Sequence, residues 1–134
     1  MAKLTTIEGI GEVLAEKLKQ AGVTSVENLL ERGSTPQGRK ELAEATGIDS
    51  SRILRFVNQA DLMRLKGVGS EYAELLEAAG VDTVAELARR NAANLHAKLV
   101  EINEAKKLVR QVPSLSQVEA WIAQAKELPR AVAY

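Results

Sequence analysis

The sequence predicts an all-α protein built as an internal duplication. Apolar residues recur at helical spacing along most of the chain, and no alternating strand pattern lasts for more than a few residues. A pentapeptide of the pattern apolar–charged–Gly–apolar–Gly occurs twice, at residues 7–11 and at residues 65–69, each time before a predicted helix. We therefore expect eight to nine short helices in two related halves.

The two pentapeptides, here called the first glycine turn (residues 7–11) and the second glycine turn (residues 65–69), begin segments that match in register. Gly9 and Gly67 are 58 residues apart, and so are Gly22 and Gly80 in the two Ala-Gly-Val sequences that follow. A turn, a helix, a stop and a restart at one spacing indicate an internal repeat. We place repeat 1 at about residues 7–64 and repeat 2 at about residues 65–128. The segments that match after the helix stops are Thr24-Ser25-Val26-Glu27-Asn28-Leu29 and Asp82-Thr83-Val84-Ala85-Glu86-Leu87.

In repeat 1, the first helix is expected from Glu12 to Ala21, where Gly22 ends it. The second helix is expected to begin after the N-cap Thr24, with Glu27 as its capping-box partner. Gly33 and the serine after it end this helix. The apolar residues expected on the inner faces of these two helices are Val13, Leu14, Leu18, Ala21, Val26, Leu29 and Leu30.

A third helix is expected to start at Thr35 as the N-cap, with Pro36 in the first turn and Gly47 at the end. Asp49 is the expected N-cap of a fourth helix, which runs from Ser50 to about residue 64 and leads into the second glycine turn. The apolar residues expected to face the core are Leu42, Ala43, Ile53, Leu54, Phe56, Val57, Ala60 and Met63.

Repeat 2 follows the same plan with an extension. Asp82 and Asn91 are the expected N-caps of two helices, the second of which continues to about Gln111. Ser114 and Gln117 predict a capping box for the last helix. The expected core residues are Tyr72, Leu75, Leu76, Ala79, Val84, Leu87, Ala88, Leu95, Leu99, Val100, Ile102, Leu115, Val118, Trp121, Ile122 and Ala125.

We expect both repeats to lie in one compact domain that spans residues 1–134. No linker rich in Ser, Gly or Pro separates them, and a half of about 60 residues buries too little surface to be more than marginally stable alone. Apolar residues make up 46% of the chain but only 3% are aromatic, so aliphatic side chains have to form most of the core.

The segments IEGIGEVLAEKLKQAGV and LKGVGSEYAELLEAAGVDTVAEL resemble helix-hairpin-helix units. Such units occur in DNA repair glycosylases, ligases, polymerases and excision-nuclease subunits. The whole chain is similar to an uncharacterised bacterial family of unknown function built as a tandem helix-hairpin-helix, and the close match covers residues 7–30 and 65–88. The resemblance implies two units paired about a pseudo-twofold axis, with both glycine turns on one side and spaced to touch two strands of a duplex.

The glycine turns are the candidate binding sites. Glycine enters left-handed backbone conformations at little cost, so the chain can reverse there while the apolar residues point inward and the amides face out. Free N–H groups at a helix N-terminus favour an anion such as phosphate. A tight structural connector between helices explains the same residues, so both interpretations stay open. By resemblance, the phosphate contacts are Gly9, Ile10, Gly11, Gly67, Val68, Gly69 and Ser70, with Lys66 and either Lys17 or Lys19 assisting.

The charge pattern argues against strong nucleic-acid binding. The chain has 18 basic and 18 acidic residues, and a nucleic-acid-binding domain usually shows a basic excess because phosphate neutralisation supplies most of the affinity. Arg52, Arg55 and Lys66 form a candidate phosphate patch that the net charge conceals. A solvated charged helix face is the simpler explanation for the other basic residues. The acidic residues next to the two turns, which would repel a phosphate, are Glu8, Glu12, Glu16, Glu71, Glu74 and Glu77.

A protein–protein or self-associating scaffold, in which the turns are purely structural, is the alternative function. The helix around Trp121 and the tail at residues 128–134 are its candidate docking elements, although a single tryptophan also suits the core of a Leu-rich bundle. In both functions the protein is a binding module, and its partner is a nucleic acid, another protein or a second copy of the chain.

We expect no enzymatic activity, cofactor or metal site. The chain has no cysteine, and His96 is its one histidine, so no second histidine or cysteine offers metal-ligand spacing. No phosphate-binding Gly-rich loop ending in Lys-Ser/Thr and no Ser/His/Asp arrangement is present. Since the sequence has neither an apolar run of about 20 residues nor a secretory signal, we expect a cytoplasmic protein without membrane contact.

Overall fold

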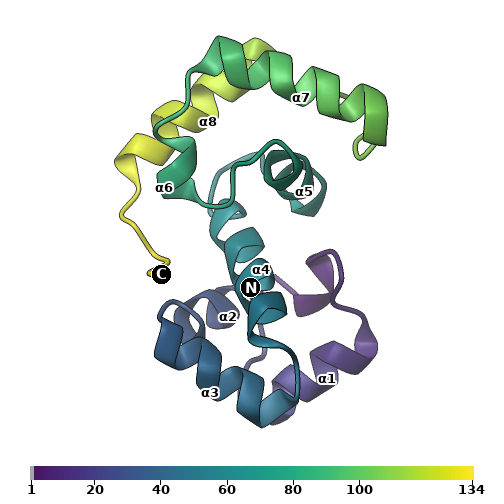
Figure 1. Ribbon diagram of the computed structural model, residues 1–134, viewed down its shortest axis with the longest axis vertical. Coiled ribbons are helices and arrows are strands. Elements are labelled where there is room, and N and C mark those ends of the chain that lie inside the picture. Colours follow the sequence, from purple (N-terminus) through teal and green to yellow (C-terminus); the bar gives the residue numbers. More distant parts are fainter. Residues whose placement is uncertain (1) are drawn as a thin grey trace. The chain divides into compact units, whose positions relative to one another are not determined.

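The computed structural model describes residues 2–134 of the protein (Figure 1). In this range it contains eight α-helices and one 3-10 helix and no strand, which confirms the predicted all-α class. The 3-10 helix spans Leu4–Thr6, and the α-helices are α1 Glu12–Gln20, α2 Val26–Arg32, α3 Pro36–Thr46, α4 Ser50–Leu62, α5 Ser70–Ala78, α6 Val84–Leu87, α7 Ala92–Lys106 and α8 Leu115–Glu127.

The chain divides into two compact units. Unit 1 contains the residues up to Asp61 together with Ala131–Tyr134, and unit 2 contains Leu62–Arg130. The chain therefore passes into unit 2 at the end of α4 and returns to unit 1 after residue 130. Unit 2 is one continuous segment, whereas unit 1 is assembled from two.

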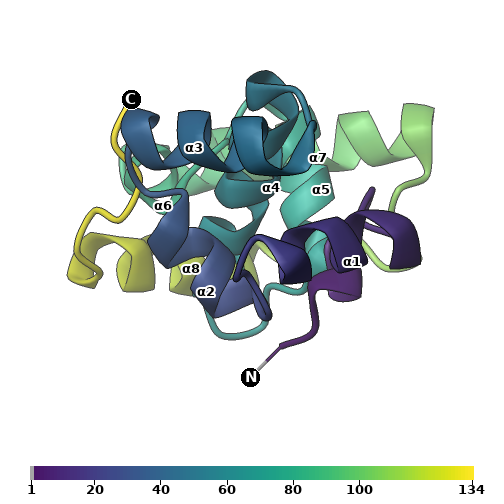
Figure 2. The ribbon, with the colours of Figure 1, turned by 90° about the horizontal axis from the view of Figure 1, so that it is seen from below.

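Each unit has its own helix contacts, which can be followed in Figures 1 and 2. In unit 1, α3 packs against α1 and α2, and α1 also contacts the 3-10 helix. In unit 2, α8 packs against α6 and α7, and α7 also contacts α5. The side chains that fill the centre of unit 2 include Leu65, Leu75, Leu76, Val81, Leu87, Leu95, Leu99, Val118, Trp121 and Ile122.

The two helices that follow the glycine turns end in the same way. At the end of α1, Gly22 has φ 90° and its N–H donates to the Lys19 carbonyl at 3.0 Å. The next N–H, that of Val23, donates to the Leu18 carbonyl at 2.9 Å. The same pair of hydrogen bonds recurs at the end of α5 around Gly80, which has φ 91°. Both ends are Schellman motifs, in which a left-handed glycine lets the last carbonyls find donors.

The N-caps of α2 and α6 differ from those predicted. Ser25, not Thr24, caps α2, and Thr83, not Asp82, caps α6. Each capping hydroxyl accepts the backbone N–H three residues later, at 3.0 Å and 3.2 Å respectively. Both capping residues are buried while the predicted ones are exposed. The prediction was one residue early because neighbouring polar residues offer similar oxygen atoms, and packing of the next residue decides between them.

Other predicted signals are confirmed. Thr35 caps α3 with Pro36 in its first turn, and Gly47 ends that helix in the left-handed conformation. Asn91 caps α7 through its side chain, which accepts the N–H three residues later. Both hydrogen bonds of the capping box at Ser114 are present at the start of α8.

The prediction for the end of α7 was wrong by several residues. The helix ends at Lys106, and Lys107 takes a left-handed conformation with φ 50°. The Asn103 side chain then holds the returning chain, because its Oδ1 accepts the Val109 N–H at 3.0 Å and its Nδ2 donates to the Val109 carbonyl at 3.1 Å. The segment expected to complete the helix is therefore a loop that turns back beside Asn103.

The expected inner face of α1 was also partly wrong. Val13 is 71% exposed, whereas Leu18 is fully buried. The two residues are five positions apart, which places them about 140° apart around a helix of 3.6 residues per turn. A helix of nine residues with its buried side at Leu18 therefore turns Val13 toward solvent.

Candidate functional site

The first glycine turn is a tight reversal whose central glycine is required by the fold. The Ile10 N–H donates to the Ile7 carbonyl at 3.1 Å, and Gly9 between them has φ 95°. Positive φ at the third position is the mark of a type II turn, where glycine is favoured. Both isoleucines are buried, and a Cβ atom added to Gly9 would lie 3.1 Å from Cε1 of Phe56.

The second glycine turn has the same construction. The Val68 N–H donates to the Leu65 carbonyl at 3.2 Å, and Gly67 has φ 85°. Both apolar residues are buried. A Cβ atom added to Gly67 would lie 3.5 Å from Nε1 of Trp121, which is an ordinary van der Waals distance.

Each turn thus lies against an aromatic ring from a distant helix, and local sequence patterns carry no signal for this pairing. Trp121 is 3% exposed, which confirms it as a core residue, and it also contacts Tyr72 with ring centroids 5.3 Å apart. The Tyr72 hydroxyl donates to the Gln111 carbonyl at 3.0 Å. These contacts connect α5, α8 and the loop after α7 around the second glycine turn.

Gly11 and Gly69, the last residues of the two turns, differ from the central glycines. They are the N-cap residues of α1 and α5, with φ of −91° and −96°, angles that any residue adopts. A Cβ atom added to either would meet no atom within 4 Å. Neither provides a side-chain cap, whereas side chains cap α2, α3, α6, α7 and α8. Nothing inside the described part of the protein therefore requires glycine at these two positions.

The amides of the turns fall into two groups. The N–H groups of Ile10 and Val68 donate within the turns, so these two predicted contacts have an internal acceptor. The N–H groups of Gly11 and Gly69 donate to no acceptor among residues 2–134. The amides of the turns that have no internal acceptor are therefore those at the start of each helix, and Ser70 begins α5 directly after Gly69.

A surface hollow of about 380 Å³ lies at the second glycine turn. Its charged side chains are Glu71 and Arg110, and its other lining residues are Gly67, Gly69, Ser70, Tyr72, Val109 and Gln111. The predicted continuation of α7 to about Gln111 would put Arg110 on a helix, but α7 ends at Lys106. The loop held by Asn103 brings this arginine to the turn instead. Lys66, also predicted here, is exposed, and its N–H donates to Gln124 Oε1 at 2.9 Å.

The first glycine turn is more acidic. Glu8 within the turn and Glu12 directly after it are both exposed. A hollow of about 410 Å³ beside α1 includes Glu12 with Lys3, Glu16 and Lys19, but none of the turn glycines. The predicted helpers Lys17 and Lys19 lie further along α1, in its last turn. The charged side chains in this turn and directly after it are therefore both carboxylates.

The remaining predicted site residues lie on α4. Arg52 is exposed, and its guanidinium carbon is 5.6 Å from the centroid of the Phe56 ring, a cation–π arrangement. Phe56 is the ring that supports Gly9, so Arg52 is linked to the first glycine turn through it. Arg55 is exposed on the same helix.

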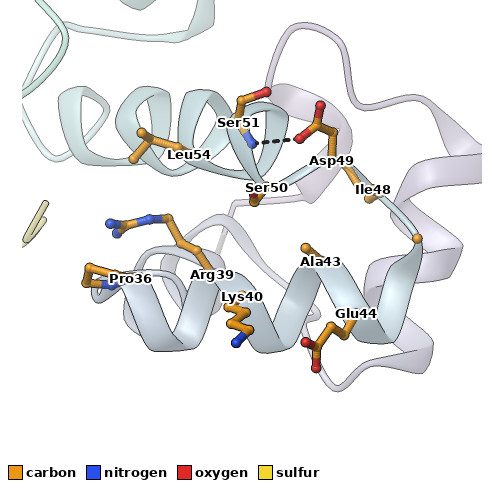
Figure 3. A pocket seen from close by; sticks show the side chains of 11 residues that line it. Pro36, Arg39, Lys40, Ala43, Glu44, Ile48, Asp49, Ser50, Ser51 and Leu54 are labelled. Carbon is orange, nitrogen blue, oxygen red and sulfur yellow. Dashed lines mark hydrogen bonds between the residues drawn. The ribbon is translucent and has the colours of Figure 1, made fainter.

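A further hollow of about 630 Å³ lies between α3 and α4, away from the glycine turns (Figure 3). Its lining mixes the apolar Ala43, Ile48 and Leu54 with charged residues of both signs. The Ser51 N–H donates to Asp49 Oδ1 at 3.2 Å on its rim, which caps the start of α4 (Figure 3). No predicted site residue lines it.

Within residues 2–134, no three His, Cys, Asp or Glu side chains are grouped so that they could hold a metal ion. In the same range, none of the helices combines the length and the apolar character that crossing a bilayer demands.

Comparison with known proteins gives a family and no structural relative. No solved structure matches the chain. The profile of one family, described as a domain of unknown function (DUF4332), matches residues 8–128 and therefore covers α1 to α8, the second glycine turn and all of the first glycine turn except Ile7. The chain thus belongs to the family of the domain of unknown function DUF4332.

Proposed function

We propose that the protein is a non-enzymatic binding module that holds a nucleic-acid backbone, independently of base sequence, at its two glycine turns. The observation that carries this proposal is the pair Gly11 and Gly69. A glycine that neither its backbone angles nor its neighbours require is explained if an external group has to approach the backbone closely.

In the proposed complex, a phosphate oxygen takes the place of the missing N-cap side chain. It accepts hydrogen bonds from the N–H groups of Gly11 or Gly69 and of the helical turn that follows, where the helix dipole favours negative charge. The Ser70 hydroxyl adds a donor at the second turn. Contacts of this kind position a nucleic acid but do not distinguish its bases. The turns and their flanking helices would then act as helix-hairpin-helix units.

The two turns are expected to contribute unequally. Lys66 and Arg110 lie at the second turn and attract a phosphate, although Glu71 lines the same hollow. Glu8 within the first turn and Glu12 directly after it repel a phosphate. The second turn is therefore the principal site, and because the net charge of the chain is zero, we expect weak binding that falls with added salt.

Protein–protein interaction is the second candidate function. Positive φ accounts for Gly9 and Gly67 without any ligand, and a chain without net charge suits a protein partner. In that case the turns would be structural elements only.

The experiment that tests the proposal is a titration of single-stranded, duplex and branched DNA and of RNA at low and moderate salt. The informative variant is the double change Gly11→Asp and Gly69→Asp. Aspartate is a good N-cap, so both helices should be as stable as before or more stable. Its carboxylate would occupy the amides and repel phosphate, so binding should be lost.

The matched control is Ala45→Asp with Ala97→Asp, which adds the same charge on exposed positions of α3 and α7. This control should bind nearly as well as the natural chain. Equal loss in both double variants would show that only net charge matters, which contradicts a specific role for the turns. If the natural chain binds no nucleic acid at low salt, the protein-interaction function is the one that stands.

A further inference from the structure

The loop after α7 contains a strained backbone position that is not a glycine. Within residues 2–134, positive φ occurs at five glycines and at Lys107, which has φ 50° and is the C-cap residue of α7. Glycine is the common residue at such a helix end, because a side chain makes the left-handed conformation unfavourable. A residue that bears this strain and a long charged side chain indicates a role for that side chain.

The charges around this position are basic. Residues 106–110 read Lys-Lys-Leu-Val-Arg, and no other five-residue stretch of the chain has three basic residues and no acidic one. Lys106, Lys107 and Arg110 are exposed, and within residues 2–134 no ion pair joins either lysine to a carboxylate. Lys106 already places a positive charge in the last turn of α7, where it complements the helix dipole. The dipole therefore does not account for the second, strained lysine.

This basic segment is fixed beside the second glycine turn. The Asn103 side chain bonds both backbone groups of Val109, and the Tyr72 hydroxyl donates to the Gln111 carbonyl. Arg110 lies between these two anchored residues and lines the hollow of about 380 Å³ at the turn.

Lys107 precedes Arg110 by three residues, so the Cα atoms of the two are at most about 11 Å apart. Lys106, Lys107 and Arg110, here called the basic loop, thus lie along a short path from the end of α7 to the hollow. All three belong to unit 2, as does the second glycine turn. The path therefore does not involve unit 1.

The hollow also contains an aromatic ring. Tyr72 lines it, is half-buried and packs against Trp121, while Glu71 is the one acidic residue of the lining. Proteins that bind single strands combine a basic path for the backbone with aromatic rings on which bases stack. A base in a duplex is enclosed in its stack and has to be extruded before it enters a pocket. An aromatic hollow beside a basic path therefore favours a single strand.

We propose that the second glycine turn and the basic loop form one continuous site for a single-stranded nucleic acid. The inference rests on the proposed function and adds to it both the path of the strand and the class of partner. One phosphate meets the Gly69 amide, the adjoining base lies in the hollow against Tyr72, and the next phosphates contact Arg110 and Lys107.

A salt series on full-length protein tests the path. The double variant Lys106→Gln with Lys107→Gln is titrated with a labelled single strand. Its slope of log affinity against log salt should be smaller by about 1.4, because each lost phosphate contact removes about 0.7. At about 0.05 M salt its affinity should be at least about tenfold lower. The matched control is Lys98→Gln with Lys126→Gln, which removes two charges from exposed positions of α7 and α8 and should change affinity less than about twofold.

A second variant separates the strain at Lys107 from its charge. Lys107→Gly should raise the midpoint of urea denaturation, because glycine adopts the left-handed conformation at little cost. The same change should weaken binding of the single strand as much as Lys107→Gln does. A lower midpoint in Lys107→Gly would show that the lysine supports the fold, which contradicts the argument from strain.

The outcomes distinguish this inference from the proposed function. If Gly69→Asp abolishes binding but the double lysine variant binds as its control does, the turn binds nucleic acid and the inference alone is wrong. Duplex bound as tightly as a single strand of equal length also overturns the inference. A natural chain that binds no nucleic acid at low salt contradicts the inference and the proposed function together.

Discussion

Gly9 lies directly against the ring of Phe56, and a Cβ atom on this glycine would approach Cε1 to 3.1 Å. Gly11, two residues later, has open space around it and an ordinary extended backbone. Two glycines of one turn thus have different physical roles. The fold requires glycine at the first position, whereas nothing within residues 2–134 requires it at the second.

This contrast predicts opposite effects of alanine at the two positions. Gly9→Ala should lower the free energy of unfolding by about 1–3 kcal/mol, because it forces positive φ on a residue with a side chain and crowds Phe56. Gly11→Ala should leave it unchanged or raise it by up to about 1 kcal/mol, because alanine restricts the unfolded chain. Urea denaturation of both variants checks the prediction, and equal losses would contradict it.

The second turn should tolerate the same change better. Gly67 also has positive φ, but its added Cβ would be 3.5 Å from Trp121 Nε1, an ordinary contact. Gly67→Ala should therefore cost only the backbone strain of about 1–2 kcal/mol. Denaturation of Gly67→Ala beside Gly9→Ala measures the difference. A larger loss at Gly67 would mean that crowding by Phe56 adds nothing.

The position of the N-cap of α2 can be tested by a pair of neighbouring substitutions. Ser25→Ala should lower the free energy of unfolding by about 1 kcal/mol, because the hydroxyl that accepts the Asn28 N–H is lost. Thr24→Ala should cost less, since Thr24 is exposed and its side chain does not cap the helix. Thermal or urea unfolding distinguishes the two variants. A larger loss of stability in Thr24→Ala than in Ser25→Ala would indicate that Thr24 is the N-cap.

The Asn103 side chain should control both stability and the position of Arg110. Asn103→Ala removes two hydrogen bonds to the backbone of Val109 and should lower the free energy of unfolding by about 1–3 kcal/mol. If the second glycine turn binds a phosphate backbone, the same variant should bind more weakly, because the loop that carries Arg110 is no longer fixed.

A matched control separates the two effects of Asn103. Arg110→Gln removes the charge without touching the loop contacts, so it should reduce binding and leave the unfolding curve unchanged. A change in unfolding with Arg110→Gln would indicate that the arginine also supports the loop.

Helical periodicity and capping residues were sufficient to predict the helices themselves. The capping box at Ser114 and the stop at Gly47 rest on contacts within one turn of helix, which a short stretch of sequence determines. The end of α7 could not be predicted in the same way. It depends on Asn103 reaching a residue six positions later, beyond the last regular turn, and the sequence there still reads as helix-forming.

The candidate site was predicted less completely. The repeated pentapeptide located both turns, but it could not separate Gly9 from Gly11, because that distinction comes from Phe56 in a distant helix. Arg110 was not predicted at the second glycine turn, because the sequence predicted that α7 continues past this residue. The hydrogen bond between Arg39 and the Ala133 carbonyl joins residues 94 positions apart, and no local pattern carries such information.

Because unit 1 holds residues from both ends of the sequence, it should respond to mechanical load in an unusual order. The Ala2 N–H is bonded to Glu27 Oε1 at 3.0 Å, and Ala133 is bonded to Ser34 and Arg39 in the same unit. A stretching force between handles at residues 2 and 134 would pass through unit 1 alone, leaving Leu62–Arg130 slack. Tension would reach α5 to α8 only after residues 131–134 had detached from unit 1. The contacts of these four residues therefore set the force at which unit 2 begins to bear load.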